Sequence, residues 1–185
     1  MANASMTMNA ISDVRHHSGW FIALGILFLI AGVFALAMPL IAGLAVTTIF
    51  AIVLVWLGIV EFIHAWNVKS WGGFIWEVII ALVMFLGGIA IWINPILGAL
   101  TLTIVVAATF IAKGVFQIIL GFRMRPNDGW GWMVTAGVLD LIVGLIIWLN
   151  WPVSTAWALG TLAGISLIFT GWSYIMIAMA ARRLG

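Results

Sequence analysis

Long apolar stretches alternate with short breaks along this chain of 185 residues. The apolar stretches run over residues 19–38, 43–65, 73–93, 97–121, 131–149 and 154–180. Each reaches the roughly 20 residues that a helix needs to cross a hydrocarbon core of about 30 Å. The pattern therefore predicts an all-α integral membrane protein with six transmembrane helices.

The composition agrees with a membrane location. Hydrophobic residues make up 66% of the chain and charged residues 6%, whereas soluble domains carry about 25% charged residues. The segment before the first apolar stretch contains no hydrophobic core followed by a cleavage site, so we expect a retained tail. The chain has no cysteine, which excludes disulfides and cysteine metal sites, and we expect no cofactor.

The apolar pattern repeats three times, with a period of about 56 residues. Each repeat holds two spans, so all three copies cross the membrane in the same direction. We therefore predict three parallel-repeat helical hairpins in a pseudo-threefold arrangement. The small residues that recur, and that we expect at helix contacts, are Gly25, Ala81 and Gly137; Gly32, Gly88 and Gly144; and Gly58, Gly114 and Gly171.

The repeats divide the chain into segments of one membrane domain. We expect a cytoplasmic tail over 1–17, followed by hairpin repeats over 18–69, 70–125 and 126–185. Pro39, Pro95 and Pro152 end the first helix of each hairpin, because proline interrupts the helical hydrogen bonds. The Gly160-x-x-x-Gly164 motif is expected to pack within the chain rather than between two copies.

Basic residues fall on one side of the predicted membrane topology, and the opposite turns carry no charge. The positive-inside rule then places both termini in the cytoplasm. These cations need no nucleic-acid partner; the expected partners are membrane lipids, a homo-oligomer is left open, and no protein partner is indicated. The basic residues used in this assignment are Arg15, Lys69, Arg123, Arg125, Arg182 and Arg183.

Asp140 is the clearest departure from the repeat, because Phe28 and Met84 occupy its position in the other copies. A charge near mid-membrane costs roughly 2.5 to 3.5 kcal/mol, so the carboxylate should be neutral, paired or hydrated. Lys113 is the expected partner. Lys113 is counted from Pro95 and Asp140 from Pro152; at about 1.5 Å per residue, the two then lie about 9 Å apart in depth. Lys113 therefore either extends toward Asp140 or carries its ammonium toward the interface.

A second polar set is expected near the cytoplasmic ends of the helices. Glu61, Gln117 and Tyr174 occupy matching positions in the three copies. They form either interfacial hydrogen bonds between repeats or an ion-binding gate. His64 lies three residues beyond Glu61 and could share a proton with it. Glu77 is interpreted as a carboxylate interacting with the positive end of a helix dipole, and the histidines lack the spacing of a metal site.

The triplicated hairpin, the proline-bearing turns and the segment Gly-Val-Leu-Asp-Leu-Ile-Val-Gly at 137–144 resemble the HdeD-type acid-resistance membrane proteins. The resemblance covers about residues 15 to 183. It implies a multi-pass protein of a bacterial or archaeal cytoplasmic membrane, associated in some members with survival of acid stress. It supplies no catalytic residues.

Two functions are compatible with these features. The first is a non-enzymatic stress-response protein in which the buried charges hold the helices together. The second is a small proton-linked or ion-linked transporter or channel that uses Asp140, Lys113 and Glu61. The first is favoured, because a transport path needs more polar lining than three ionisable residues and the threonines of the outer halves. Those threonines are Thr47, Thr48, Thr101, Thr103, Thr155 and Thr161.

The charge asymmetry predicts the topology directly. Single cysteines introduced at Lys69 and Arg125 should react only with membrane-permeant reagents in intact cells, whereas one at Asn94 should react with impermeant reagents. A reporter fused to the C-terminus should be active only in the cytoplasm. A C-terminus on the outer side would contradict six spans.

Overall fold

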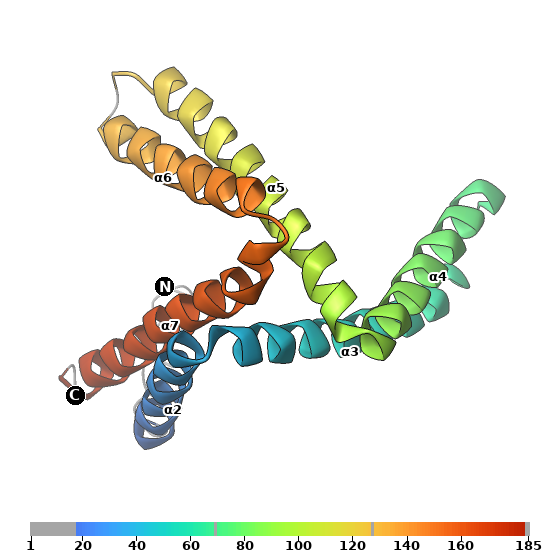
Figure 1. Cartoon of the computed structure of the whole chain (residues 1–185), viewed down its shortest axis with the longest axis horizontal. Helices are drawn as coiled ribbons and strands as arrows, with labels where there is room; N and C mark the ends of the chain where they lie inside the picture. The colour runs from blue at the N-terminus through green and yellow to red at the C-terminus, as the bar shows by residue number, and fades with distance from the viewer. Residues whose placement is uncertain (1–17, 69, 127, 184–185) are drawn as a thin grey trace, which may run out of the picture. The chain divides into compact units, whose positions relative to one another are not determined.

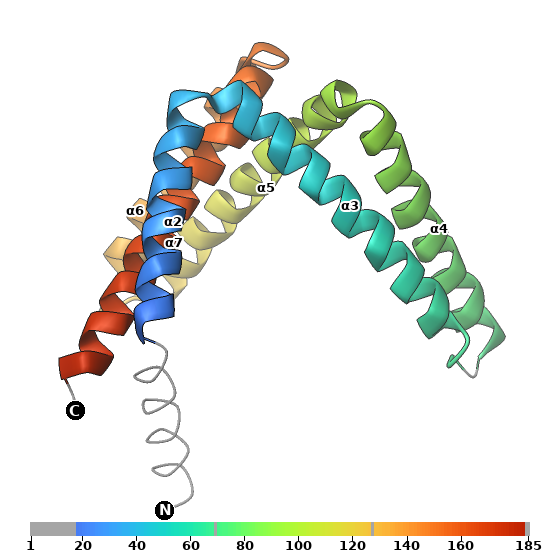
Figure 2. The ribbon, with the colours of Figure 1, turned by 90° about the horizontal axis from the view of Figure 1, so that it is seen from below.

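The computed structural model describes residues 18–68, 70–126 and 128–183, all of them in helices, turns or loops. Six of the helices are long and apolar enough to cross a membrane, as predicted. Figures 1 and 2 show the helices in chain order. Their bounds are α2 Ser18–Ala37, α3 Pro39–Ala65, α4 Trp71–Ile93, α5 Pro95–Arg123, α6 Trp130–Leu149, the short 3-10 helix η1 Val153–Ala156 and α7 Ala158–Arg183.

The chain forms two compact units. One contains α2, the first residues of α3, and α7 from Gly160 onward; the other runs from Gly43 to Leu159. The second unit therefore includes most of α3 together with α4, α5, α6 and η1.

The first two prolines begin helices as well as ending the preceding ones. Pro39 is the first residue of α3 and Pro95 the first of α5, where the sequence pattern had predicted starts at 43 and 97. Proline fits this position because its missing N–H would have no helical partner there. Asn94 completes the second turn, since its side-chain oxygen accepts a hydrogen bond from the amide of Leu97 at 3.3 Å. A single residue therefore separates the helices at each turn.

The third turn is longer and is built differently. The chain leaves α6 at Leu149 and passes through η1 before α7 begins. The Ser154 hydroxyl donates to the carbonyl of Ile147 at 2.8 Å, and the indole N–H of Trp151 donates to the carbonyl of Leu100 at 3.3 Å. The turn after α6 thus lies beside Leu100, near the start of α5.

Helix α5 packs closely against α6 through facing glycines. A methyl group placed on Gly114 would lie 2.6 Å from the amide nitrogen of Leu141 and 2.7 Å from the carbonyl oxygen of Gly137. A methyl group on Gly144 would lie 2.8 Å from the amide nitrogen of Ile111. The backbones are in contact, as small residues allow in membrane helices.

Helices α3 and α4 pair through the corresponding positions. A methyl group on Gly58 would lie 2.7 Å from the amide nitrogen of Phe85, and one on Gly88 would lie 2.8 Å from that of Val55. Helix α3 thus makes its close glycine contacts with α4, which belongs to the next predicted repeat. The predicted hairpins follow the order of the helices along the chain, whereas the close contact joins the last helix of one predicted hairpin to the first helix of the next.

Helices α2 and α7 form the third close pair, in the other unit. Methyl groups on Gly25 and Gly32 would lie 2.8 Å from the carbonyl oxygens of Gly171 and Gly164. Gly160 lies against the backbone of Pro39. The Gly160-x-x-x-Gly164 motif therefore packs within the chain, which confirms that expectation.

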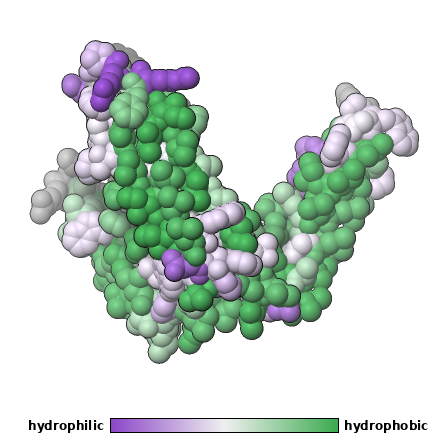
Figure 3. Space-filling view, turned by 45° about the horizontal axis from the view of Figure 1, so that its top comes forward, coloured by the Kyte–Doolittle hydropathy of each residue, from purple (hydrophilic) through white to green (hydrophobic). Residues whose placement is uncertain are grey.

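Small buried residues recur every seven positions, so they line one side of each helix. Many large apolar side chains lie outside, where lipid can cover them; Trp132, for example, is 81% exposed, although Ile147 is fully buried. Figure 3 shows hydrophobic residues covering most of the visible helix sides. The buried small positions are Gly25 and Gly32; Ala81 and Gly88; Gly137 and Gly144; Ala51, Gly58 and Ala65; Ala107, Gly114 and Gly121; and Gly164, Gly171 and Ala178.

Two adjacent glycines of α4 provide a matched test of this packing. A methyl group on Gly88 would meet the backbone of α3, whereas one on Gly87 meets nothing within 4 Å. Gly88→Ala should lower the free energy of unfolding by about 1 to 3 kcal/mol through overpacking. Gly87→Ala should be neutral or stabilising by up to about 1 kcal/mol, because alanine favours helix. Thermal denaturation in one detergent compares them, and equal melting temperatures would contradict the contact.

Candidate functional site

Lys113 and Asp140 form an ion pair between α5 and α6. The Lys113 ammonium lies 3.0 Å from Asp140 Oδ2, and the two side chains are 56% and 19% exposed. The pair follows from the glycine contact, because Lys113 precedes Gly114 and Asp140 precedes the Leu141 that Gly114 touches. Of the two outcomes that the sequence left open for Lys113, the structure shows the paired one.

The depth offset of about 9 Å expected between these residues was wrong, because it assumed that the prolines of both turns lie at one level. The Trp151 hydrogen bond instead aligns the α6 turn with Leu100. Depth is therefore counted from Leu100 to Lys113 along α5, and from Trp151 back to Asp140 along α6. The helical rise then places both residues near the same level, about 20 and 17 Å from the turn.

Three metal-ligating side chains meet between α3 and α4. Glu61 and His64 lie near the end of α3, and Glu77 lies in the second turn of α4. One ligand atom from each of the three lies within 4.8 Å of the others. His64 Nδ1 is 3.6 Å from Glu77 Oε1, with side-chain exposures of 62% and 24%. We refer to Glu61, His64 and Glu77 as the α3–α4 cluster.

The sequence placed His64 beside Glu61 but missed Glu77 as their partner. A helix dipole acts appreciably only within the first turn of a helix. Glu77 lies in the second turn of α4, so the helix dipole does not explain its position. Its position is explained by the facing residues of α3. The repeat contained a signal for this partnership. Phe21 is equivalent to Glu77 and Tyr174 to Glu61, and two aromatic residues able to stack at these positions indicate that the positions face each other.

Gln117 and Tyr174 have different surroundings from Glu61. Tyr174 packs against Phe21 and Phe28, with ring centroids 5.8 and 5.7 Å apart. The Gln117 side chain lies beside Gly137, and its carbonyl oxygen is buried without a hydrogen-bond partner within the described residues. Glu61 thus faces an acidic partner, Gln117 faces an apolar one, and Tyr174 faces aromatic ones.

Most of the threonines considered as polar lining are bonded within their own helices. Four of the hydroxyls donate to a carbonyl four residues earlier, a local bond that uses their donor group. Thr155 Oγ1 is buried and has no partner among the described residues. The four are Thr47 to Gly43 at 2.8 Å, Thr48 to Leu44 at 2.9 Å, Thr101 to Leu97 at 2.9 Å, and Thr103 to Ala99 at 2.7 Å.

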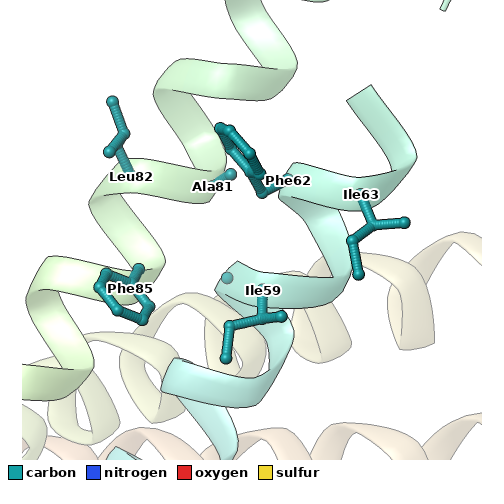
Figure 4. Close-up of a pocket in the computed structure, with 7 residues that line it drawn as sticks. Ile59, Phe62, Ile63, Ala81, Leu82 and Phe85 are labelled. Carbon is teal, nitrogen blue, oxygen red and sulfur yellow. The ribbon is translucent and has the colours of Figure 1, made fainter. Parts of the chain in front are cut away.

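An apolar groove of about 280 Å³ lies between α3 and α4. Figure 4 shows its side chains, which are aliphatic or aromatic and carry no ionisable group. Such a groove offers apolar contacts to whatever lies against it. Its lining residues are Gly58, Ile59, Phe62, Ile63, Ala81, Leu82 and Phe85.

Several sequence predictions fall outside the described residues. They concern the tail that includes Arg15, His16 and His17, and Lys69 in the loop between α3 and α4.

Comparison with known proteins supports the resemblance inferred from the sequence. Protein HdeD from Escherichia coli K12 is 25% identical over 159 residues, covering 84% of this chain and 83% of HdeD. The HdeD proteins of Escherichia coli O157:H7 and Shigella flexneri match to the same extent. No solved structure matches the chain.

A protein family described as "Short repeat of unknown function (DUF308)" matches residues 23–91 and 79–149. The starts of the two matched segments are separated by one period of the sequence repeat, and together the segments extend over more than half of the chain. With its six apolar helices, the chain belongs to this DUF308 family of short repeats, as an HdeD-like multi-pass membrane protein.

Proposed function

We propose that this protein is a non-enzymatic component of a bacterial or archaeal cytoplasmic membrane that contributes to resistance against acid or envelope stress. The acid-stress role is the one implied by resemblance to the HdeD type. In this proposal the polar residues within the helices hold the membrane domain together, and the protein acts through its lipid-facing surface or a partner.

The Lys113–Asp140 ion pair is the observation that carries this proposal. An isolated charge in the membrane is costly, and an opposite charge at 3.0 Å offsets much of that cost. Lys113 is more than half exposed whereas Asp140 is 19% exposed, so the long lysine side chain reaches the carboxylate from the outer side of the helix pair. A carboxylate engaged in this way stabilises the contact between α5 and α6.

Three hairpin repeats with pseudo-threefold symmetry are part of the proposal. The close glycine contacts recur with the period of the sequence repeat in the pairs α3–α4, α5–α6 and α2–α7. We further propose that both termini face the cytoplasm, on the basis of the basic residues. The exposed apolar side chains favour membrane lipids as partners, and a homo-oligomer is compatible with them.

The transporter or channel alternative has less support. Asp140 and Lys113 connect α5 to α6, whereas Glu61 faces α4. Four of the threonine hydroxyls that would line a path are bonded to their own helices. A polar path connecting the three ionisable groups is therefore less favoured than separate structural contacts.

A double-mutant cycle tests the structural role of the ion pair. Asp140→Ala should lower the free energy of unfolding by about 1 to 2 kcal/mol, less than the roughly 3 to 5 kcal/mol of a fully buried pair, because Lys113 is partly exposed. Adding Lys113→Met should restore part of the loss, since no unpaired charge then remains. Chemical denaturation in detergent measures all four proteins, and strictly additive losses would rule out coupling.

A second experiment separates the stress role from transport. Deletion of the gene in its host should reduce survival after acid shock, and Asp140→Asn should restore survival to within about twofold of the wild type, because asparagine retains a hydrogen-bonding side chain. Liposomes containing wild-type protein should show the same pH-driven proton flux as empty liposomes. Flux that appears with the wild type and disappears with Asp140→Asn would favour the transporter instead.

A further inference from the structure

We propose that the α3–α4 cluster binds one divalent first-row transition-metal ion, with Glu61, His64 and Glu77 as its protein ligands. This site is independent of the Lys113–Asp140 pair and of the proposed stress function.

The geometry of the cluster suits a single ion. Its three ligand atoms lie within 4.8 Å of one another. Metal bonds to histidine nitrogen and carboxylate oxygen are about 2.0 to 2.2 Å long, so ligands of one ion are separated by roughly 3 to 4.4 Å. The three atoms therefore need only a small shift to reach this range, and the contact of Gly58 with Phe85 holds the backbones of α3 and α4 together.

The charges of the cluster call for a cation. Glu61 and Glu77 place two carboxylates together, and like charges at such separation repel unless a proton or cation lies between them. Within the described residues, His64 is the basic side chain paired with Glu77. Glu77 Oε2 is buried and has no hydrogen-bond partner there. A metal ion would satisfy this oxygen and neutralise both carboxylates.

The ligand types indicate the class of metal. A glutamate and a histidine three residues apart on one helix, completed by a carboxylate from a facing helix, is an arrangement used by metal sites in helical bundles. One imidazole nitrogen with two carboxylate oxygens favours zinc, manganese, iron or cobalt over calcium and magnesium, which prefer all-oxygen sites. Because His64 lies near the end of α3 and is 62% exposed, the remaining coordination positions are open to further ligands.

The other two helix pairs show that the cluster is not needed for packing. The positions equivalent to Glu61, His64 and Glu77 are Gln117, Leu120 and Met133 in α5–α6, and Tyr174, Ile177 and Phe21 in α7–α2. Those pairs make the same close glycine contacts without this set of ligands. The two facing carboxylates of α3–α4 are therefore an addition to the common framework, which is consistent with a binding role.

Isothermal titration of tag-free, chelator-treated full-length protein with Zn²⁺ tests the site. The starting protein carries His16→Gln and His17→Gln, so that the two tail histidines cannot bind zinc. It should bind one equivalent of Zn²⁺, and the ion should raise its melting temperature. Further substitution of Glu61→Gln, His64→Gln or Glu77→Gln should each weaken binding at least tenfold and abolish the rise. Asp140→Asn serves as the matched control and should bind like the starting protein.

The metal-free melting temperatures of all variants establish that each one folds. Absence of zinc binding by the starting protein would overturn the proposal, and so would undiminished binding by a folded Glu77→Gln variant. If the glutamine variants melt higher than the starting protein and no zinc binds, the two glutamates share a proton instead of a metal ion.

Discussion

Close approach of helix backbones through small residues is the constraint on which the rest of this structure depends. Lipid tails are as apolar as leucine, so burying large apolar side chains between helices gains little in a membrane. Gly114 and Gly137 meet with their backbones in contact, and Gly25 and Gly171 meet in the same way. Bulky residues such as Trp132 and Leu149 remain outside. Small residues line the closest contacts of each helix pair, whereas many bulky side chains lie at its surface.

The glycine contacts also determine which polar side chains meet. Once Gly114 touches Leu141, the neighbouring Lys113 and Asp140 are brought to 3.0 Å. In the α3–α4 pair, the contact of Gly58 with Phe85 sets a register in which Glu61 faces Glu77. The polar contacts therefore follow from the packing. Because the glycines set the register, the residue beside them can differ chemically from one helix pair to another.

The sequence predicts the membrane class, the helices and the glycines well, because hydropathy and the repeat period act along the chain itself. It does not reveal which helices pair. Chain order favours a hairpin partner, yet Gly58 packs against the helix that follows, and only three-dimensional register exposes this. The missed role of Glu77 has the same origin. The ion pair was anticipated from charge. The predicted difference in depth between Lys113 and Asp140 was wrong, because the third turn lies beside Leu100.

Repeat proteins of this kind can change their chemistry at constant architecture. The small residues carry the packing and recur in each pair, whereas the positions equivalent to Asp140 hold Phe28 and Met84. A side chain beside the glycine contact can change from aromatic to acidic if its new partner neutralises it, as Lys113 does. In the α3–α4 cluster, His64 pairs with Glu77, whose second carboxylate oxygen is buried without a hydrogen-bond partner among the described residues. The two carboxylates that lie together there need a proton or a cation between them, and this distinguishes the cluster from the ion pair.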